Sequence, residues 1–218
     1  MLLYIARHGQ SNGNTGADDT LDPVLTDIGL RQAELLGEYL SGTKFDAIFA
    51  STLVRSIQTA AGVASRQPGG PAPLEVLADL VECGTTPGWK GRTREDLLKF
   101  YPDLVLTKDS IPPDYPSWED ESIEIEHLAR AYRVISYIKQ RFDPYSDKKI
   151  LLVAHGGFNQ KLLAAAMGWG NASGVIYSQS NTCLNLIEYF REKDGSPRVR
   201  LKYTNAVTHL LDKDCPIT

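Results

Sequence analysis

The sequence predicts an α/β fold, a three-layer sandwich with a mainly parallel central sheet flanked by helices. Three short apolar runs, over residues 2–6, 45–50 and 150–154, have the continuous hydrophobicity of strands that are buried on both faces. Each run is followed by a segment with helical spacing, and alternating strands and helices favour a parallel sheet. A chain of 218 residues that is 42% hydrophobic is long enough to bury one sizeable core.

The helices are predicted from apolar spacing and from their end signals. Thr26 is expected to cap the first helix, which we expect to stop at Gly42 in a left-handed conformation. Ser51 or Thr52 is the expected cap of the second helix. This second helix is expected over residues 52–64, and further helices are expected over residues 93–101, 120–141 and 158–167.

The remaining chain completes one domain over residues 1–218. Two late strands, residues 182–190 and 198–204, are expected to complete the sheet, and an edge strand there leaves open the pairing of two copies into a homodimer. Residues 80–118 lose strand character and gain prolines and aromatic residues, so we expect them to form an inserted cap over the carboxyl ends of the strands.

Composition excludes several classes of function. A net charge of −4 argues against a nucleic-acid binder, and no apolar run is long enough to span a membrane, so we expect a cytoplasmic protein. The three cysteines lack C-x-x-C spacing, which predicts neither disulfides nor a zinc site. With no P-loop and no dinucleotide-binding motif, no cofactor is expected.

Charged and imidazole side chains recur where the predicted strands end. Arg7 and His8 follow the first apolar run, and His155 follows the run over residues 150–154. Arg55 lies about one turn into the helix after the strand that ends at Ala50. If these strands are neighbours, two guanidinium groups and two imidazoles share one pocket, which favours a phosphoryl group as the bound anion.

Two other uses of the histidines fit less well. A divalent metal would be repelled by the adjacent arginines, and the sequence contains no H-E-x-x-H motif, so no metal site is predicted. The segment "HGGF" at His155 is compatible with an oxyanion loop, but a serine hydrolase also needs a G-x-S-x-G elbow, which is absent.

Five segments, in this order and spacing, resemble the histidine phosphatase superfamily, whose members are phosphoglycerate-mutase-like. They are "RHGQSNGN", "LTDIGLRQA", "STLVRSIQTA", "VECGTTPGWKGRT" and "LLVAHGG". The resemblance implies that His8 becomes phosphorylated and that Glu82 is the proton donor. It also implies a phosphate pocket formed by Arg7, Asn14, Arg55 and His155.

The residue chemistry agrees with these implied roles. A neutral imidazole at His8 can attack phosphorus, and the resulting phosphohistidine is open to water because imidazole is a good leaving group. Arg7, Arg55 and a protonated His155 would stabilise the phosphoryl oxygens without a metal. Glu82 would donate a proton to the leaving oxygen and then activate water, with nearby Asp79 as its rival.

The cap holds the candidates for substrate specificity. Lys90 stands where related sequences often carry glutamate, and it could face a second anionic group or lie in solvent. Trp89, Tyr101 and Trp118 could wall an apolar pocket or form the cap's own small core. Ser56, the residue after Arg55, stands where related sequences often carry alanine.

Three functions follow from this reading. The first is a metal-independent phosphatase that acts on small phosphorylated metabolites. A cofactor-dependent phosphoglycerate mutase would use the same pocket but return the phosphoryl group to the substrate. The third is a non-catalytic protein that binds a phosphorylated ligand. Under this hypothesis at least one of the pocket residues or the acid would be lost, but this chain retains them all.

Overall fold

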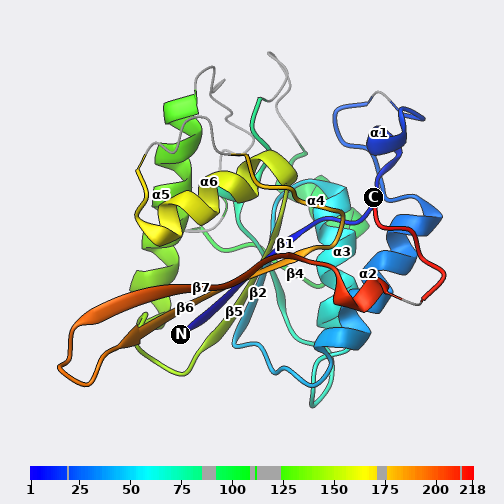
Figure 1. Ribbon diagram of the computed structural model, residues 1–218. Helices are drawn as coiled ribbons and strands as arrows, with labels where there is room; N and C mark the ends of the chain where they lie inside the picture. Colours follow the sequence, from blue (N-terminus) through cyan, green and yellow to red (C-terminus); the bar gives the residue numbers. More distant parts are fainter. Residues whose placement is uncertain (19, 85–91, 109–110, 112–123, 171–175, 212) are drawn as a thin grey trace.

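A seven-stranded sheet lies at the centre of the molecule (Figure 1). The computed structural model describes residues 1–18, 20–84, 92–108, 111, 124–170, 176–211 and 213–218. The strands are β1 (Leu2–Arg7), β2 (Ala47–Ala50), β3 (Leu74–Val76), β4 (Leu104–Val105), β5 (Lys149–Ala154), β6 (Leu184–Arg191) and β7 (Pro197–Ala206).

The strand order is β4-β3-β2-β5-β1-β6-β7. The first five strands in this order run parallel to one another, while β6 pairs antiparallel with β1 and β7 pairs antiparallel with β6. The predicted mainly parallel α/β sheet is therefore confirmed.

Helices cover both faces of the sheet. They are α1 (Asn12–Thr15), α2 (Asp27–Leu40), α3 (Val54–Ala64), α4 (Arg94–Phe100), α5 (Glu124–Phe142) and α6 (Gly156–Met167). In Figure 1, α5 and α6 lie together on one side and α2 and α3 on the other. Short 3₁₀ turns, η1 (Ala78–Leu80) and η2 (Thr208–Leu210), follow β3 and β7.

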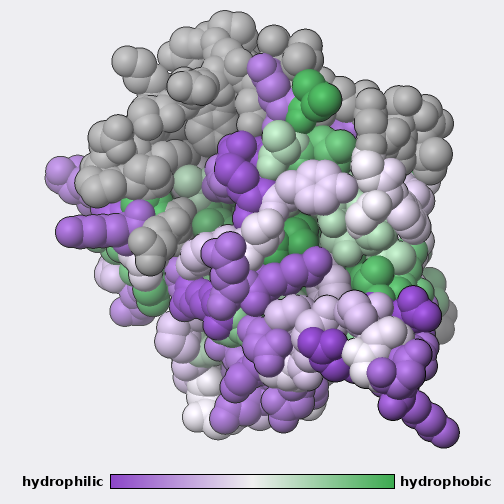
Figure 2. Space-filling view, turned by 90° about the vertical axis from the view of Figure 1, so that its left-hand side faces the viewer, coloured by the Kyte–Doolittle hydropathy of each residue, from purple (hydrophilic) through white to green (hydrophobic). Residues whose placement is uncertain are grey.

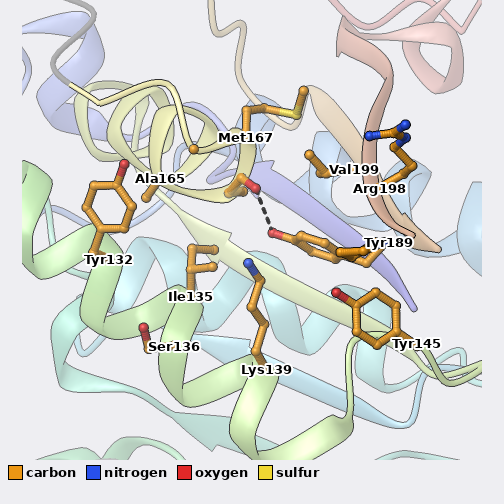
Figure 3. Close-up of a pocket in the computed structure, with 13 residues that line it drawn as sticks. Tyr132, Ile135, Ser136, Lys139, Tyr145, Ala165, Met167, Tyr189, Arg198 and Val199 are labelled. Carbon is orange, nitrogen blue, oxygen red and sulfur yellow. Dashed lines mark hydrogen bonds between the residues drawn. The ribbon is translucent and has the colours of Figure 1, made fainter. Parts of the chain in front are cut away.

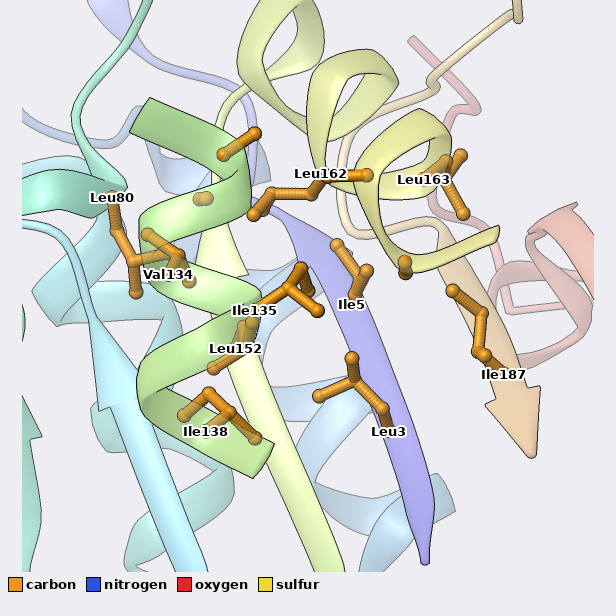
Figure 4. Packing of buried hydrophobic residues seen from close by; sticks show 14 of the residues in the cluster. Leu3, Ile5, Leu80, Val134, Ile135, Ile138, Leu152, Leu162, Leu163 and Ile187 are labelled. Atoms are coloured by element: carbon orange, nitrogen blue, oxygen red, sulfur yellow. The ribbon is translucent and has the colours of Figure 1, made fainter. Parts of the chain in front are cut away.

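Alternate residues of the strands build two hydrophobic cores, one on each face. On β1, Leu3 and Ile5 pack with residues of α5 and α6, as Figure 4 shows. Tyr4 and Ala6 of the same strand belong to the cluster that contains α3. Because both faces of β1 are buried, its sequence is a continuous apolar run rather than an alternating one.

The helix ends agree only in part with prediction. Thr26 caps α2 by accepting a hydrogen bond from the Gly29 amide at 3.0 Å, as expected. The expected left-handed Gly42 is wrong, because α2 ends at Ser41 in a right-handed conformation and Gly42 has no positive φ. The cap prediction for α3 is also wrong, since Leu53 takes that position without a side-chain bond.

Two strands and one helix were not predicted. The strand β4 lies inside the expected cap segment, contrary to the prediction that residues 80–118 lack strands; with only two residues, it is defined by pairing with β3 rather than by its own pattern. β3, with three residues, and α1, with four, are also short. Much of the expected cap, including Trp89, Lys90 and Trp118, lies outside the described residues.

One face of the molecule is largely polar in its described part. Figure 2 shows the face at the left of Figure 1, where hydrophilic side chains cover much of the coloured area and hydrophobic surface is divided into patches. No helix among the described residues is both long and apolar enough to cross a membrane.

Candidate active site

The register of β1 and β5 brings the two histidines together. Arg7 pairs with Ala154 at the ends of these parallel strands, so the residues that follow them, His8 and His155, lie side by side. Their ring centroids are 5.1 Å apart. The His8 amide donates to the Ala154 carbonyl at 3.0 Å, which extends the pairing by one residue. Both side chains are buried, as expected for residues at the floor of a pocket.

Hydrogen bonding fixes the tautomer of His8. Its Nδ1 lies 2.6 Å from the carbonyl oxygen of Gly9, and a carbonyl can only accept, so Nδ1 carries the proton. The other nitrogen, Nε2, is left with its lone pair. The main chain is held as well, because the His8 carbonyl accepts bonds from the Thr182 amide and from Asn181 Nδ2 at 2.9 Å.

Two arginines accompany the histidines. Arg7 ends β1 and donates from Nη1 to the carbonyl of Gln179. Arg55 is the second residue of α3, and its Nη1 lies 3.9 Å from Asp22 Oδ1. Asp22 also accepts from the Val54 amide at 2.9 Å, so one carboxylate holds both the start of α3 and its arginine.

Three buried nitrogen atoms in this cluster have no hydrogen-bond partner. They are Arg7 Nε, Arg55 Nη1 and His155 Nδ1, three of the six such side-chain atoms among the described residues. Buried polar groups are almost always paired, because an unpaired group loses its bonds to water without replacement. Their gathering at one place is therefore the feature expected of a site whose partner is an anionic ligand.

Electrostatics keep both imidazoles neutral. Burial, and then the charges of Arg55 and Arg7, lower the pKa of His8 well below its usual range. Burial, followed by Arg55 and His8, lowers the pKa of His155 in the same direction. In the ligand-free protein His155 is therefore neutral, and the protonated form expected with a bound phosphoryl group stays a prediction.

Glu82 lies at the start of α6, next to His155. Its carboxylate accepts from the Phe158 amide at 2.8 Å and from the Gly157 amide at 3.2 Å. The approach needs glycine, because a Cβ at Gly157 would lie 2.9 Å from Glu82 Oε1. The rival carboxylate, Asp79, instead faces α5, where Oδ2 lies 3.3 Å from Arg133 Nε.

Arg130 of α5 supports the segment that carries Glu82. It is buried and donates to the carbonyls of Asp79, Val81 and Glu82, at 2.9, 2.7 and 3.2 Å. Its guanidinium also lies over the ring of Phe158 in α6, 3.9 Å from the centroid. The sequence analysis missed Arg130; a cation among the apolar positions of α5 was the available signal.

Asn14 lies at the edge of the site, and its role stays a prediction. Its Oδ1 accepts from the Ser11 amide at 3.0 Å and from Asn181 Nδ2 at 3.2 Å, which leaves the amide NH₂ group as a donor. Asn181 therefore links Asn14 to the His8 carbonyl. No spacing in the sequence pointed to Asn181 or to Gln179, because both lie in a segment without regular structure.

Other parts of the described chain offer no second catalytic cluster. No group of three or more histidine, cysteine, aspartate or glutamate residues suited to a metal occurs among the described residues. A cavity of about 330 Å³ lies at the far end of α6 from His155, between α5 and the β6–β7 hairpin (Figure 3). It is lined by Tyr132, Lys139 and Tyr189, among others, and by none of the six predicted site residues.

Comparison with known proteins identifies the family of this chain. The model of the histidine phosphatase superfamily (branch 1) matches residues 3–201. The chain belongs to the histidine phosphatase superfamily. The resemblance drawn from the sequence motifs is thereby confirmed.

Relatives of this histidine phosphatase are themselves named phosphatases. The chain is 28% identical to the uncharacterized phosphatase PhoE of Bacillus subtilis, over 95% of this chain and 96% of that protein. It is 27% identical to a glucosyl-3-phosphoglycerate phosphatase of Mycolicibacterium vanbaalenii, over 79% and 82%. The protein is therefore a phosphoric monoester hydrolase.

A solved structure shows the same fold. The YhfR protein of Bacillus stearothermophilus superposes with a TM-score of 0.66 over 95% of this chain and 98% of that one, at 24% identity.

Proposed function

We propose that this histidine phosphatase hydrolyses small phosphomonoesters without a metal, through a phosphohistidine on His8. The observation that carries the proposal is the bare Nε2 of His8 beside the unpaired donors of Arg7 and Arg55. A neutral nucleophile next to fixed positive charge suits attack on a phosphate that already carries negative charge.

In the first step His8 Nε2 forms a bond to phosphorus as the ester P–O bond breaks. Glu82, in its protonated form, transfers its proton to the departing alkoxide. Arg7 and Arg55 bind the phosphoryl oxygens, and Asn14 donates from its NH₂ group. These contacts hold the three oxygens while phosphorus moves from the ester oxygen to His8 Nε2.

In the second step water replaces His8 on phosphorus. The Glu82 carboxylate takes a proton from the attacking water as the N–P bond breaks. Inorganic phosphate then leaves the site, and Glu82 is again in its protonated form.

The substrate is expected to be a small phosphorylated metabolite. One relative is named for the phosphatase reaction on glucosyl-3-phosphoglycerate, which supports this class but not that compound. The relatives include phosphatases and also a phosphoglycerate mutase of Schizosaccharomyces pombe, 26% identical over 89% of this chain, so the mutase reaction stays the second candidate function.

Release of inorganic phosphate from an aryl phosphate in excess EDTA tests the proposal. We expect activity to persist in the chelator and to fall at least about a thousandfold in His8→Ala. Undiminished activity in His8→Ala would refute the nucleophile. A wild type that releases no phosphate but isomerises 3-phosphoglycerate would establish the mutase instead.

A further inference from the structure

Two buried serines lie on the side of His155 that faces away from His8, because β2 and β1 flank β5 on opposite sides. Ser51 follows β2 and Ser56 lies in the first turn of α3, and neither side chain is exposed. Ser51 Oγ lies 2.7 Å from His155 Nε2. The proposed function uses neither hydroxyl.

The hydrogen-bond inventory of Ser51 decides how it meets the ring. A hydroxyl has one hydrogen to donate and two lone pairs to accept with. One lone pair already accepts from the Leu53 amide at 3.2 Å. The hydrogen has no acceptor other than His155 Nε2 among its hydrogen bonds in this fully buried position.

The two possible tautomers of His155 differ in what they leave unsatisfied. If Nε2 carried the proton, the Ser51 hydrogen would be buried without an acceptor, and a bare Nδ1 would remain among cationic groups. If Nδ1 carries the proton, the Ser51 hydroxyl donates to Nε2, and the only group of Ser51 and His155 without a hydrogen bond is the Nδ1–H donor. The second arrangement leaves one group unsatisfied instead of two.

Ser56 fixes the position of Ser51. Its Oγ accepts from the Ser51 amide at 3.0 Å and donates to the Val153 carbonyl at 2.7 Å. The hydroxyl therefore reinforces the link between the ends of β2 and β5, where the Ser51 amide also donates directly to the Val153 carbonyl at 3.3 Å. An alanine at this position, frequent in related sequences, has no hydroxyl to form the bridge.

We propose that Ser51 is a positioning residue that holds His155 in the Nδ1–H tautomer, and that Ser56 holds Ser51. A neutral His155 then presents a donor on the ring edge that points away from Ser51. This arrangement replaces the protonated imidazole expected from the sequence. It rests on the proposed function only for the identity of the acceptor, a phosphoryl oxygen.

Histidine-labelled protein tests the tautomer directly. The chain has four histidines, so long-range ¹H–¹⁵N spectra of [¹⁵N]histidine protein resolve each ring, and His155→Gln assigns the signal. We expect His155 with a protonated Nδ1 in the wild type and a mixture of tautomers in Ser51→Ala. A wild-type spectrum with a protonated Nε2 would overturn the proposal without any variant.

Titration with inorganic phosphate tests the consequence. Ser51→Ala should weaken phosphate binding about tenfold, and Ser56→Ala should weaken it less, because it acts through Ser51. Ser146→Ala is the matched control, since that hydroxyl also bridges a carbonyl and an amide but lies at the other end of β5. Equal phosphate affinity in Ser51→Ala and in the wild type would contradict the positioning role.

The two proposals fail separately. A wild type with the expected tautomer but no phosphate binding would refute the phosphatase site and leave the Ser51–His155 arrangement standing. Phosphate binding together with a protonated Nε2 would do the reverse.

Discussion

Glu82 has contacts that allow two functions for one carboxylate. It accepts two amide bonds at the start of α6 and so stabilises the helix end, where a negative charge is favourable. The same carboxylate interacts electrostatically with Arg7 and Arg55, the arginines that are proposed to bind the phosphoryl group. These roles separate when the charge is removed and the shape is kept.

Glu82→Gln should retain an acceptor for the α6 amides but lose the acid. We expect kcat/KM, which reports on the transfer of the phosphoryl group to His8, to fall about a hundredfold with an alkyl phosphate and much less with nitrophenyl phosphate, whose leaving group needs no proton. Steady-state kinetics with the two substrates measure the difference. Asp79→Asn is the control, since its carboxylate faces Arg133; equal losses on both substrates in Glu82→Gln would exclude it as the acid.

At the scale of elements, the loop after His8 is held by direct contact with α2. The Thr26 amide donates to the Gln10 carbonyl at 2.9 Å, and the Gln10 amide donates to Gln32 Oε1 at 2.8 Å. At Gly29 the helix meets this loop so closely that an added Cβ would lie 1.9 Å from the Gln10 oxygen. Backbone contact between two elements thus fixes the position of the nucleophile's loop.

Gly29→Ala should therefore separate α2 from the loop. We expect a loss of at least about 2 kcal/mol in the free energy of unfolding, measured with urea, together with reduced phosphatase activity. Gly42→Ala is the matched control, because its Cβ would meet no atom within 4 Å and its φ is not positive. That variant should be neutral or stabilised by up to about 1 kcal/mol.

At the scale of the whole molecule, buried histidines make stability depend on pH. The pKa values of His8 and His155 are lowered mainly by burial, and burial lowers the pKa of His209 to about 4. The unfolded chain takes up protons below about pH 6.5, and the folded chain does so only at lower pH. Protons therefore favour unfolding, and stability falls as the pH drops below 6.5.

Urea unfolding at pH 7.5 and at pH 5 measures this dependence. We expect the folded state to lose stability over that interval, with roughly 2 kcal/mol from His209, whose folded pKa is about 4. His209→Gln should reduce the loss by one histidine's share without altering the pocket. A free energy of unfolding that does not change between the two pH values would contradict neutral buried rings.

Three features of the whole molecule stay predictions. The β7 strand lies at the edge of the sheet, where it can pair with a second copy of the chain. Sedimentation analysis, which measures the mass in solution, would test the predicted homodimer. The cytoplasmic location and the cap over residues 80–118 also await direct tests.

The sequence by itself determined the class of fold and the main chemistry. Buried parallel strands need continuous apolar runs, so residues 2–6 and 150–154 showed both the strands and the places where they end. Parallel strands end at one edge of their sheet, so Arg7, His8 and His155 were predictable as neighbours from their position after those runs.

The tertiary structure decided what depends on contacts between distant segments. Short elements such as β4 are defined by their partners and carry too few residues for a pattern. The support of Glu82 by Arg130, and the Ser51 hydroxyl on His155, join segments about 50 and 104 residues apart. The neutral state of His155 likewise depends on burial and nearby charge, which exist only once the chain has folded.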